Sequence, residues 1–297
     1  MKILVFGSLN IDHVYQVHHF VQPGETLASD SLQRFSGGKG MNQSVAFARF
    51  GALVWHAGAV GKQDYQMLLK ELEEAGVHTE LLLKKDAPNG HAIIQKTPEG
   101  ENSILLYGGA NQMVTEKDAD FVLSHFAQGD LIVLQNEISQ GAYIMEKAHL
   151  IGMKIALNPS PMNQAIMRMP LSYVDFLILN ELEGAALSGA AKECPREMLD
   201  QLMRAFPAAQ IVLTLGGSGS VYGYQGKTYT QPVYPVKTVD TTAAGDTFTG
   251  FFLGSIMGGN GVEQSLATAA KAAAICVSRN GAGVSIPSLQ EVETFPN

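Results

Sequence analysis

The sequence predicts an α/β fold, in which a doubly wound, mostly parallel sheet is flanked by helices and a small β-sheet lid lies beside it. Short runs rich in leucine and β-branched residues alternate with longer segments of helical period, which is typical of βαβ units. The length of 297 residues suits one large core. No linker, low-complexity tract or repeat divides the chain, so we expect a single domain over residues 1–297.

The expected strands are short apolar runs of the kind that cross a buried sheet. They are Lys2–Gly7, Val54–Ala57, Leu131–Gln135, Lys154–Asn158, Phe176–Asn180 and Gln210–Leu215. The expected helices are Gly40–Phe50, Asp64–Ala75, Thr115–His125, Gln140–Leu150, Pro195–Phe206, Thr247–Met257 and Val262–Arg279. Thr115 followed by Asp118 predicts a capping box. In the last helix, one apolar face is expected from Leu266, Ala270, Ala273 and Val277.

Two stretches break the alternation, roughly residues 12–35 and 90–108. The runs Asp12–Phe35 and His91–Tyr107 predict a small antiparallel layer, with Thr97–Gly100 as a turn between two strands. A lid over an active site would have this form. A surface hairpin without a functional role explains the pattern equally well.

Composition excludes several functional classes. The formal net charge of −8 argues against a nucleic-acid or anionic-membrane partner, because both require a basic face. Cys194 and Cys276 lie far apart and meet no histidine at zinc-ligand spacing, so reduced thiols are expected. The N-terminus becomes polar too soon for a signal peptide, and no apolar run reaches about 18 residues. We therefore expect a cytoplasmic protein.

Polar groups follow the predicted strands at the edge where ligands bind in an open α/β sheet. Five strand ends carry carboxylates, carboxamides or glycines: Gly7–Asp12, Asn136–Glu137, Asn158–Pro161, Asn180–Glu183 and Thr214–Gly219. One such end means little, since polar loops are common. Five on one edge predict a site that binds a polyol and a nucleotide.

The segment from Asp240 to Asp246 is the strongest local signal. Ala243, Ala244 and Gly245 are small and stand at the start of an apolar helix, where free amides and the helix dipole favour an anion. Asp246, in the first turn, would face a phosphate bound there and could accept a hydroxyl proton. The competing interpretation is an N-cap aspartate at an ordinary helix.

A second glycine-rich segment, Gly37–Asn42, also opens a helix. It is not a Walker A motif, because the glycine spacing before Gly40 is wrong and neither serine nor threonine follows Lys39. The first strand leads into Gly7–Asn10 rather than into a G-x-G-x-x-G motif, which disfavours a dinucleotide-binding protein.

Together these segments resemble the ribokinase (PfkB) family of sugar and nucleoside kinases over nearly the whole chain. The resemblance rests on Gly7–Asp12, Gly37–Asn42, Asn180–Glu183 and Asp240–Asp246, and the Lys39–Asn42 form is most similar to that of the ribokinases. It implies the ribokinase-like fold, sugar contacts from Asn10, Asp12, Gly38, Lys39, Asn42 and Glu137, and ATP contacts from Asn180, Thr214, Gly216, Gly219 and Gly245. Glu183 is implied to organise Mg²⁺ through water. A first-turn residue exposed on its helix is the alternative for Glu183, and a solvated loop acid is the alternative for Asp12 and for Glu137.

The resemblance also implies a site for K⁺ or another monovalent cation. Its residues would be Asp240, Thr242, Cys276, Arg279, Gly281 and Ser285, with Cys276 and Arg279 acting through backbone carbonyls. Ala270 beside Lys271 replaces a polar residue that ribokinases often place near adenine, which leaves the nucleotide preference open.

The activity implied is transfer of the γ-phosphoryl group of ATP to the 5-hydroxyl of D-ribose. Asp246 would be the base, and the amides of Ala243, Ala244 and Gly245 would form the anion hole. Another sugar or nucleoside is an alternative substrate. A remote alternative is a sugar-binding regulator without catalysis, although no DNA-binding motif supports it. The family also suggests a homodimer formed through the lid.

Overall fold

The computed structural model describes residues 1–296 and confirms the predicted fold class. One large sheet runs in the order β13-β12-β11-β10-β9-β8-β1-β4-β5, and all neighbours from β11 to β5 are parallel. Its strands are β1 Ile3–Phe6, β4 Val54–Gly61, β5 His78–Lys85, β8 Leu131–Leu134, β9 Lys154–Leu157, β10 Phe176–Asn180, β11 Gln210–Thr214, β12 Ser220–Tyr224 and β13 Lys227–Gln231.

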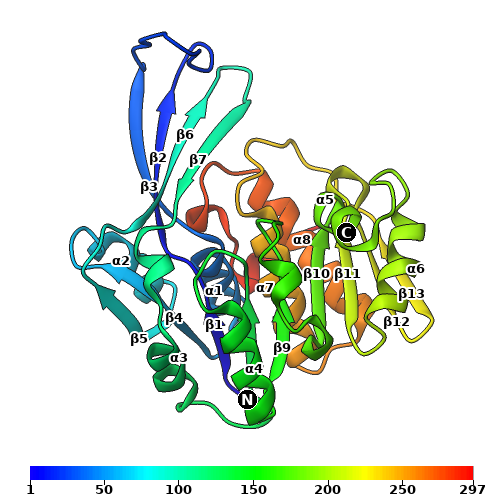
Figure 1. The fold of residues 1–297 in the computed structure, drawn as a ribbon. Coiled ribbons are helices and arrows are strands. Elements are labelled where there is room, and N and C mark those ends of the chain that lie inside the picture. The colour runs from blue at the N-terminus through cyan, green and yellow to red at the C-terminus, as the bar shows by residue number, and fades with distance from the viewer. Residues whose placement is uncertain (297) are drawn as a thin grey trace.

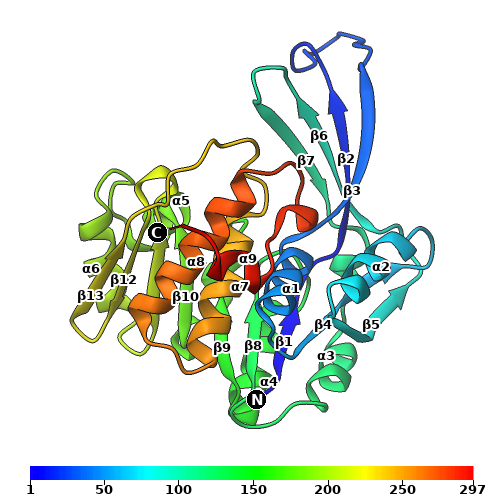
Figure 2. The same ribbon diagram turned by 180° about the vertical axis from the view of Figure 1, so that it is seen from behind.

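Helices cover both faces of this sheet (Figures 1 and 2). The helices are α1 Lys39–Phe50, α2 Gln66–Glu74, α3 Glu116–Leu123, α4 Gly141–Ile151, α5 Glu181–Ser188, α6 Pro195–Ala205, α7 Ala244–Met257, α8 Val262–Val277 and α9 Leu289–Glu293. One hydrophobic core joins α3, α4 and α6 to the sheet, and a second core on the other face joins α1, α2, α7, α8 and α9. No helix among residues 1–296 is long and apolar enough to cross a membrane.

A second sheet projects from the large one (Figure 1). Its order is β3-β2-β6-β7, from β3 Ser31–Gly37, β2 Asn10–Gln16, β6 Gly90–Lys96 and β7 Asn102–Tyr107. The prediction of a purely antiparallel layer was wrong, because the central β2–β6 pair is parallel. Both strands leave the large sheet in the same direction, and the chain returns to it between them through α1, β4, α2 and β5. We refer to this layer as the small sheet.

Other boundaries also differ from the prediction. The strand expected to end at Ala57 continues to Gly61, because Gly58 is packed against the backbone and does not form a turn. A Cβ at residue 58 would lie 2.2 Å from the Gly7 carbonyl oxygen. The four residues predicted to share one apolar face of the last helix divide between the core and the cleft. Leu266 is in the core, whereas Ala270, Ala273 and Val277 line the cleft described below. The capping box at Thr115 is present.

Candidate active site

The large sheet reverses its strand order between β1 and β8, and a crevice opens at their carboxyl ends. Ser8 follows β1, Glu137 follows β8, and Lys39 begins α1. The Ser8 hydroxyl donates to Glu137 Oε2, and the Lys39 backbone amide donates to the same oxygen at 3.0 Å. Three segments distant in sequence thus meet at one carboxylate, whose pKa is raised by burial.

Asp246 lies beside this junction and is 7% exposed. It is not an N-cap, since α7 begins after Ala243 and Asp246 is the third helical residue. Its side chain faces α1, where Asn42 Nδ2 donates to Oδ2 at 3.1 Å and Gln43 Nε2 donates to Oδ1 at 2.9 Å. Burial raises its pKa, while Lys39, Gln43 and Asn42 oppose that rise. The carboxylate is therefore held at a defined place, inside the protein, facing the crevice.

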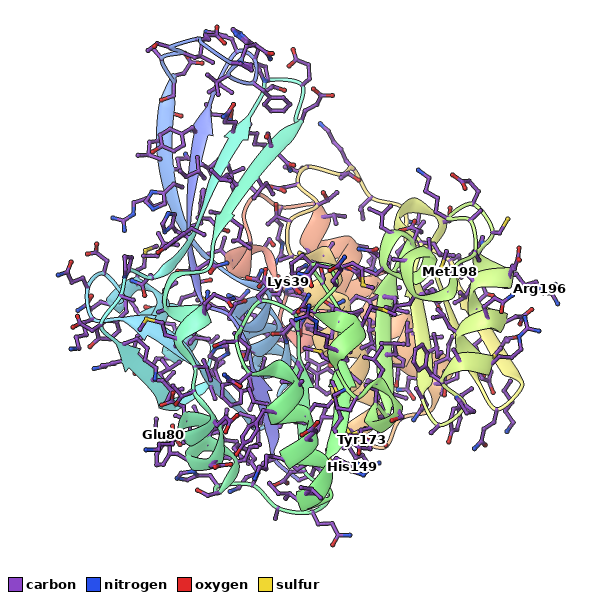
Figure 3. The ribbon with its side chains drawn as sticks, viewed as in Figure 1. Lys39, Glu80, His149, Tyr173, Arg196 and Met198 are labelled. Atoms are coloured by element: carbon purple, nitrogen blue, oxygen red, sulfur yellow. The ribbon has the colours of Figure 1, made fainter. Side chains whose placement is uncertain are left out.

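Lys39 lies near the centre of the molecule (Figure 3). Burial alone would lower the pKa of this lysine, but the carboxylates of Asp246, Glu137 and Glu183 raise it above the ordinary value. Lys39 therefore remains a cation among three acids. This arrangement suits a group that neutralises charge on a transferred phosphoryl group.

The remaining residues predicted to contact sugar surround the same crevice. Asn10 Oδ1 accepts from Asn111 Nδ2 at 2.8 Å, which fixes the direction of that amide. Gly38 has φ 96°, and a Cβ there would lie 2.8 Å from the Ser8 carbonyl oxygen, so this turn requires glycine. Asp12, in β2, is half-buried and not a solvated loop acid. Burial, and then repulsion from Glu137, raise the pKa of Asp12 to about 7.

A cleft of about 780 Å³ extends from Lys39 and Asp246 across the ends of β9, β10 and β11. The residues predicted to contact ATP line it, namely Asn180, Glu183, Thr214, Gly216, Gly219 and Gly245. Glu183 is not the exposed first-turn residue of the alternative interpretation. It is 4% exposed, and it closes a capping box with Asn180 at the start of α5. The cleft thus joins the predicted nucleotide residues to the predicted base.

The predicted anion hole is the first turn of α7. Ala243 has φ 61°, an unusual conformation for a residue with a Cβ, and no side chain among the described residues caps this helix. The prediction of three free amides needs one correction. The Ala244 amide donates to the Thr241 carbonyl oxygen at 3.3 Å, because the preceding turn is tight. All three residues line the cleft, and the amides of Ala243 and Gly245 have no such backbone partner among the hydrogen bonds described.

The residues predicted to bind a monovalent cation come from two segments that meet at the end of α8. Val239 and Asp240 both donate their amides to the Val277 carbonyl oxygen, at 2.7 and 3.2 Å. Cys276 Sγ lies 3.6 Å from the Thr242 carbonyl oxygen and 3.1 Å from Ser285 Oγ. The Asp240 carboxylate is already engaged: Oδ1 accepts from Thr242, and Oδ2 lies 3.4 Å from Lys96 Nζ of the small sheet.

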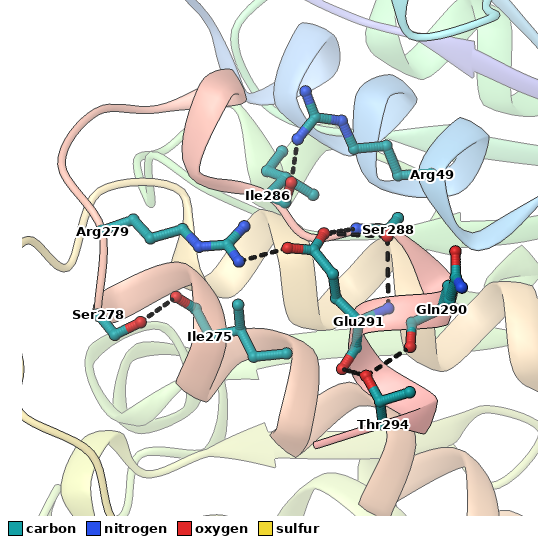
Figure 4. Close-up of polar contacts among 9 residues, drawn as sticks. All are labelled: Arg49, Ile275, Ser278, Arg279, Ile286, Ser288, Gln290, Glu291 and Thr294. Carbon is teal, nitrogen blue, oxygen red and sulfur yellow. Dashed lines mark hydrogen bonds and ion pairs between the residues drawn. The ribbon is translucent and has the colours of Figure 1, made fainter.

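The segment that follows α8, residues 278–288, is held to α1 and α9 by side-chain contacts (Figure 4). Arg279 pairs with Glu291 at 2.5 Å, and because a guanidinium has no acceptor, a cation could bind only to the backbone carbonyl of this residue. Arg49 donates to the Ile286 carbonyl oxygen. Gly281 has φ 98°, which allows the chain to turn between these anchors.

Several residues of the site were missed by the sequence analysis. Asn111 lies in the 3₁₀ turn Gly109–Met113, and Gln43 and Gln135 are buried next to Asp246 and next to each other. Residues 233–236 and Thr238 line the cleft but have no regular structure. Of the two residues on which the nucleotide preference depends, Ala270 lines the cleft, whereas Lys271 Nζ donates to the Phe295 carbonyl oxygen and lies over the Tyr234 ring.

Comparison with known proteins shows which family has this sequence and fold. The model of the pfkB family of carbohydrate kinases matches residues 1–289. The chain is 34% identical to a ribokinase of Staphylococcus aureus, over 98% of each chain. Among solved structures, it is similar to the ribokinase of Cryptococcus neoformans in complex with ADP, with a TM-score of 0.86, 33% identity and 98% of each chain covered. It is also similar to the Arabidopsis thaliana ribokinase complexed with ribose and ATP, with a TM-score of 0.87, 28% identity and 99% of each chain covered.

Proposed function

Because the chain belongs to the pfkB family of carbohydrate kinases, we propose that it transfers the γ-phosphoryl group of ATP to the 5-hydroxyl of D-ribose. One observation carries this proposal. Asp246 and Lys39 lie where the cleft that suits a nucleotide meets the polar groups that suit a sugar. The likeness to ribokinases over nearly full length, one of them complexed with ribose and ATP, supports ribose as the acceptor.

The proposed reaction is a single displacement. Asp246 accepts the proton of the 5-hydroxyl as the sugar oxygen attacks the γ-phosphorus. The new O–P bond forms as the bond to the β-phosphate oxygen breaks, and ADP leaves. The amides of Ala243 and Gly245 and the Lys39 ammonium stabilise the charge on the transferred group. Asn10, Asp12, Gly38, Asn42 and Glu137 hold the sugar, with its 5-hydroxyl toward Asp246.

The proposal includes Mg²⁺, which would neutralise charge on the ATP phosphates when bound. Glu183 fits a role in holding its water ligands, because this carboxylate lines the cleft. It is oriented by the Asn180 amide at 3.0 Å and by Asn158 Nδ2 at 3.5 Å. A cytoplasmic location also remains a prediction from the sequence.

An ADP-release assay over a panel of pentoses, hexoses and nucleosides tests this function. We expect D-ribose to have the highest kcat/KM and the product to carry its phosphate on the 5-oxygen. A higher value for a nucleoside would assign the chain to another acceptor. Release of ADP with no member of the panel would overturn the kinase proposal.

Sugar affinity should depend on pH through Asp12. Since its pKa is raised to about 7, this carboxyl is largely neutral at pH 5.5 in the ligand-free protein. A charged carboxylate binds hydroxyls more strongly than a neutral acid, so ribose binding should release a proton. Below pH 7 the Kd should therefore rise by up to about tenfold per pH unit. Titration calorimetry in two buffers of different ionisation enthalpy measures this release, which Asp12→Asn should remove. A Kd that is constant from pH 5 to 7 would contradict the assignment.

A monovalent cation such as K⁺ is also part of the proposal, because the oxygen-rich donor set suits one. Asp240, Ser285 and the carbonyls of Thr242, Cys276, Arg279 and Gly281 would hold it. The Lys96 ammonium beside Asp240 would compete with it.

Replacing Lys96 with methionine should therefore strengthen K⁺ binding by about two- to fivefold, the scale of a partly exposed ion pair. The measurement is the K⁺ concentration that gives the half-maximal rise in Tm, compared with K⁺ activation of kcat. Lys70→Met, which removes a surface lysine paired with Glu74, is the matched control. Weaker K⁺ binding in Lys96→Met would mean that Lys96 stabilises the position of Asp240 and does not compete with K⁺.

A homodimer formed through the small sheet is also part of the proposal. This sheet exposes large apolar side chains: Leu32, Ile93, Ile104, Leu105, Leu106 and Tyr107. Four of them lie on β7, an edge strand whose backbone is open to pairing. Light scattering should give the mass of a dimer for the wild type and of a monomer for Leu105→Lys. A monomeric wild type would contradict the proposal.

A further inference from the structure

Two buried glutamines connect the Asp246 carboxylate to the end of β8. Gln43 Nε2 donates to Asp246 Oδ1 at 2.9 Å, and Gln135 Nε2 donates to Gln43 Oε1 at 2.7 Å. Their side chains are 0% and 1% exposed, and neither lines the cleft. Gln43 therefore contacts Asp246 directly, and Gln135 contacts it only through Gln43. Neither residue could touch a nucleotide bound in the cleft.

The chemistry of the three groups fixes the direction of this chain. An ionised carboxylate only accepts hydrogen bonds, so Gln43 must present its NH₂ group to Asp246 and its oxygen to Gln135. Gln135 must then present its own NH₂ group to Gln43. A reversed Gln43 amide would place its oxygen against the carboxylate.

The space for Gln135 is provided by a glycine. A Cβ on Gly7, directly after β1, would lie 2.1 Å from Gln135 Oε1. That oxygen is buried and has no hydrogen-bond partner among the described residues. An unpaired buried oxygen destabilises a fold. Gln135 is thus poorly explained by stability alone, and its one bond goes to the residue that contacts Asp246.

We propose that Gln135 and Gln43 are positioning residues, which hold Asp246 in one orientation and in its ionised form. The inference rests on the proposed role of Asp246 as the base. Lys39, from α1, is the titratable group whose charge acts on Asp246. The charge of Asp246 in turn raises the pKa of Glu137, in the loop after β8, and of Cys276, in α8. None of them contacts Gln135 in the hydrogen bonds described.

The test uses Gln43→Met, Gln135→Glu and the wild type. Gln43→Met removes the donor to Asp246, so the acid limb of the kcat–pH profile should move up by about one pH unit. Gln135→Glu is nearly isosteric and, when ionised, only accepts, so it should turn the Gln43 amide, place an oxygen against Asp246 and add a second negative charge nearby. Its shift should be larger, with little change in the KM for ATP. If Gln135→Glu fails to fold, Gln43→Met carries the test.

Ser44→Ala is the matched control, because Ser44 is equally buried on α1 but contacts His56 at 2.7 Å rather than Asp246. It should lower Tm without moving the acid limb. A purely structural role for the glutamines predicts the same behaviour in their variants. Acid limbs within about 0.3 pH unit of the wild type would therefore overturn the proposal.

A second readout does not depend on turnover. In protein labelled with ¹³C at aspartate carboxyls, the resonance missing from Asp246→Asn belongs to Asp246, and its titration midpoint should rise in both glutamine variants. If the wild type phosphorylated no sugar but the midpoint moved as expected, the proposed function would fail and the positioning inference would stand. If the wild type phosphorylated a sugar but the midpoint did not move in the variants, the proposed function would stand and the positioning inference would fail.

Discussion

Replacing Asp246 with asparagine should lower kcat by about 10³-fold, within the range of 10² to 10⁴ that a positioned general base contributes. Asparagine has nearly the same shape but cannot accept the hydroxyl proton. Its NH₂ group would also face one of the two amide donors, Asn42 or Gln43, that now hold the carboxylate. The KM for ribose should change much less than kcat, because the other residues proposed to contact the sugar remain.

Steady-state kinetics and the Kd for ribose together test this expectation. Asp130→Asn is the matched control, since Asp130 is also buried and also accepts two hydrogen bonds, in its case from the backbone amides of Lys2 at 2.7 Å and Ala127 at 3.0 Å. It lies at the amino end of β8, away from the cleft, so it should lower Tm and leave kcat nearly unchanged. A kcat for Asp246→Asn within about tenfold of the wild type would show that another group accepts the proton.

The parallel strands at the centre of the fold could be predicted because they are buried on both faces. The run Leu131–Leu134 is entirely apolar, and β1 and β10 are similar. Strand β5 was missed because its sequence, His78–Lys85, mixes charged and apolar residues at the sheet edge. The β12–β13 hairpin was missed because it contains Gly223 and Gly226, which read as loop.

The candidate site likewise contains parts that could be predicted from the sequence and parts that could not. The residues of the predicted anion hole and Asp246 are contiguous in sequence, so a local pattern could reveal them. The pairing of Ser8 with Glu137 joins residues 129 positions apart, and no local pattern encodes it. Glycines were also ambiguous, since Gly7 and Gly58 look like breaks in the chain. They instead allow close packing against Gln135 and the backbone. Such information exists only after the segments have been placed.

The second large effect is expected at Lys39. Lys39→Met keeps most of the side-chain volume but removes the cation among Asp246, Glu137 and Glu183. Loss of one group that stabilises transition-state charge should lower kcat by about 10²-fold. The pKa values of Asp246 and Glu137 should also rise, because Lys39 lowers both. The acid limb of the kcat–pH profile should therefore move to higher pH.

These two consequences separate the roles of Lys39. If it acts only on the phosphoryl group, kcat should fall equally at every pH. If it also keeps Asp246 ionised, raising the pH should recover part of the loss. Lys39→Arg retains the charge and is the matched variant. It should keep the acid limb of the wild type, even if the larger guanidinium group contacts the phosphoryl group less well and lowers kcat. An Lys39→Met enzyme within about threefold of wild-type kcat at all pH values would exclude both roles. Because Lys39 lines the nucleotide cleft while its backbone amide binds Glu137, its charge would act on both substrates at the point where they meet.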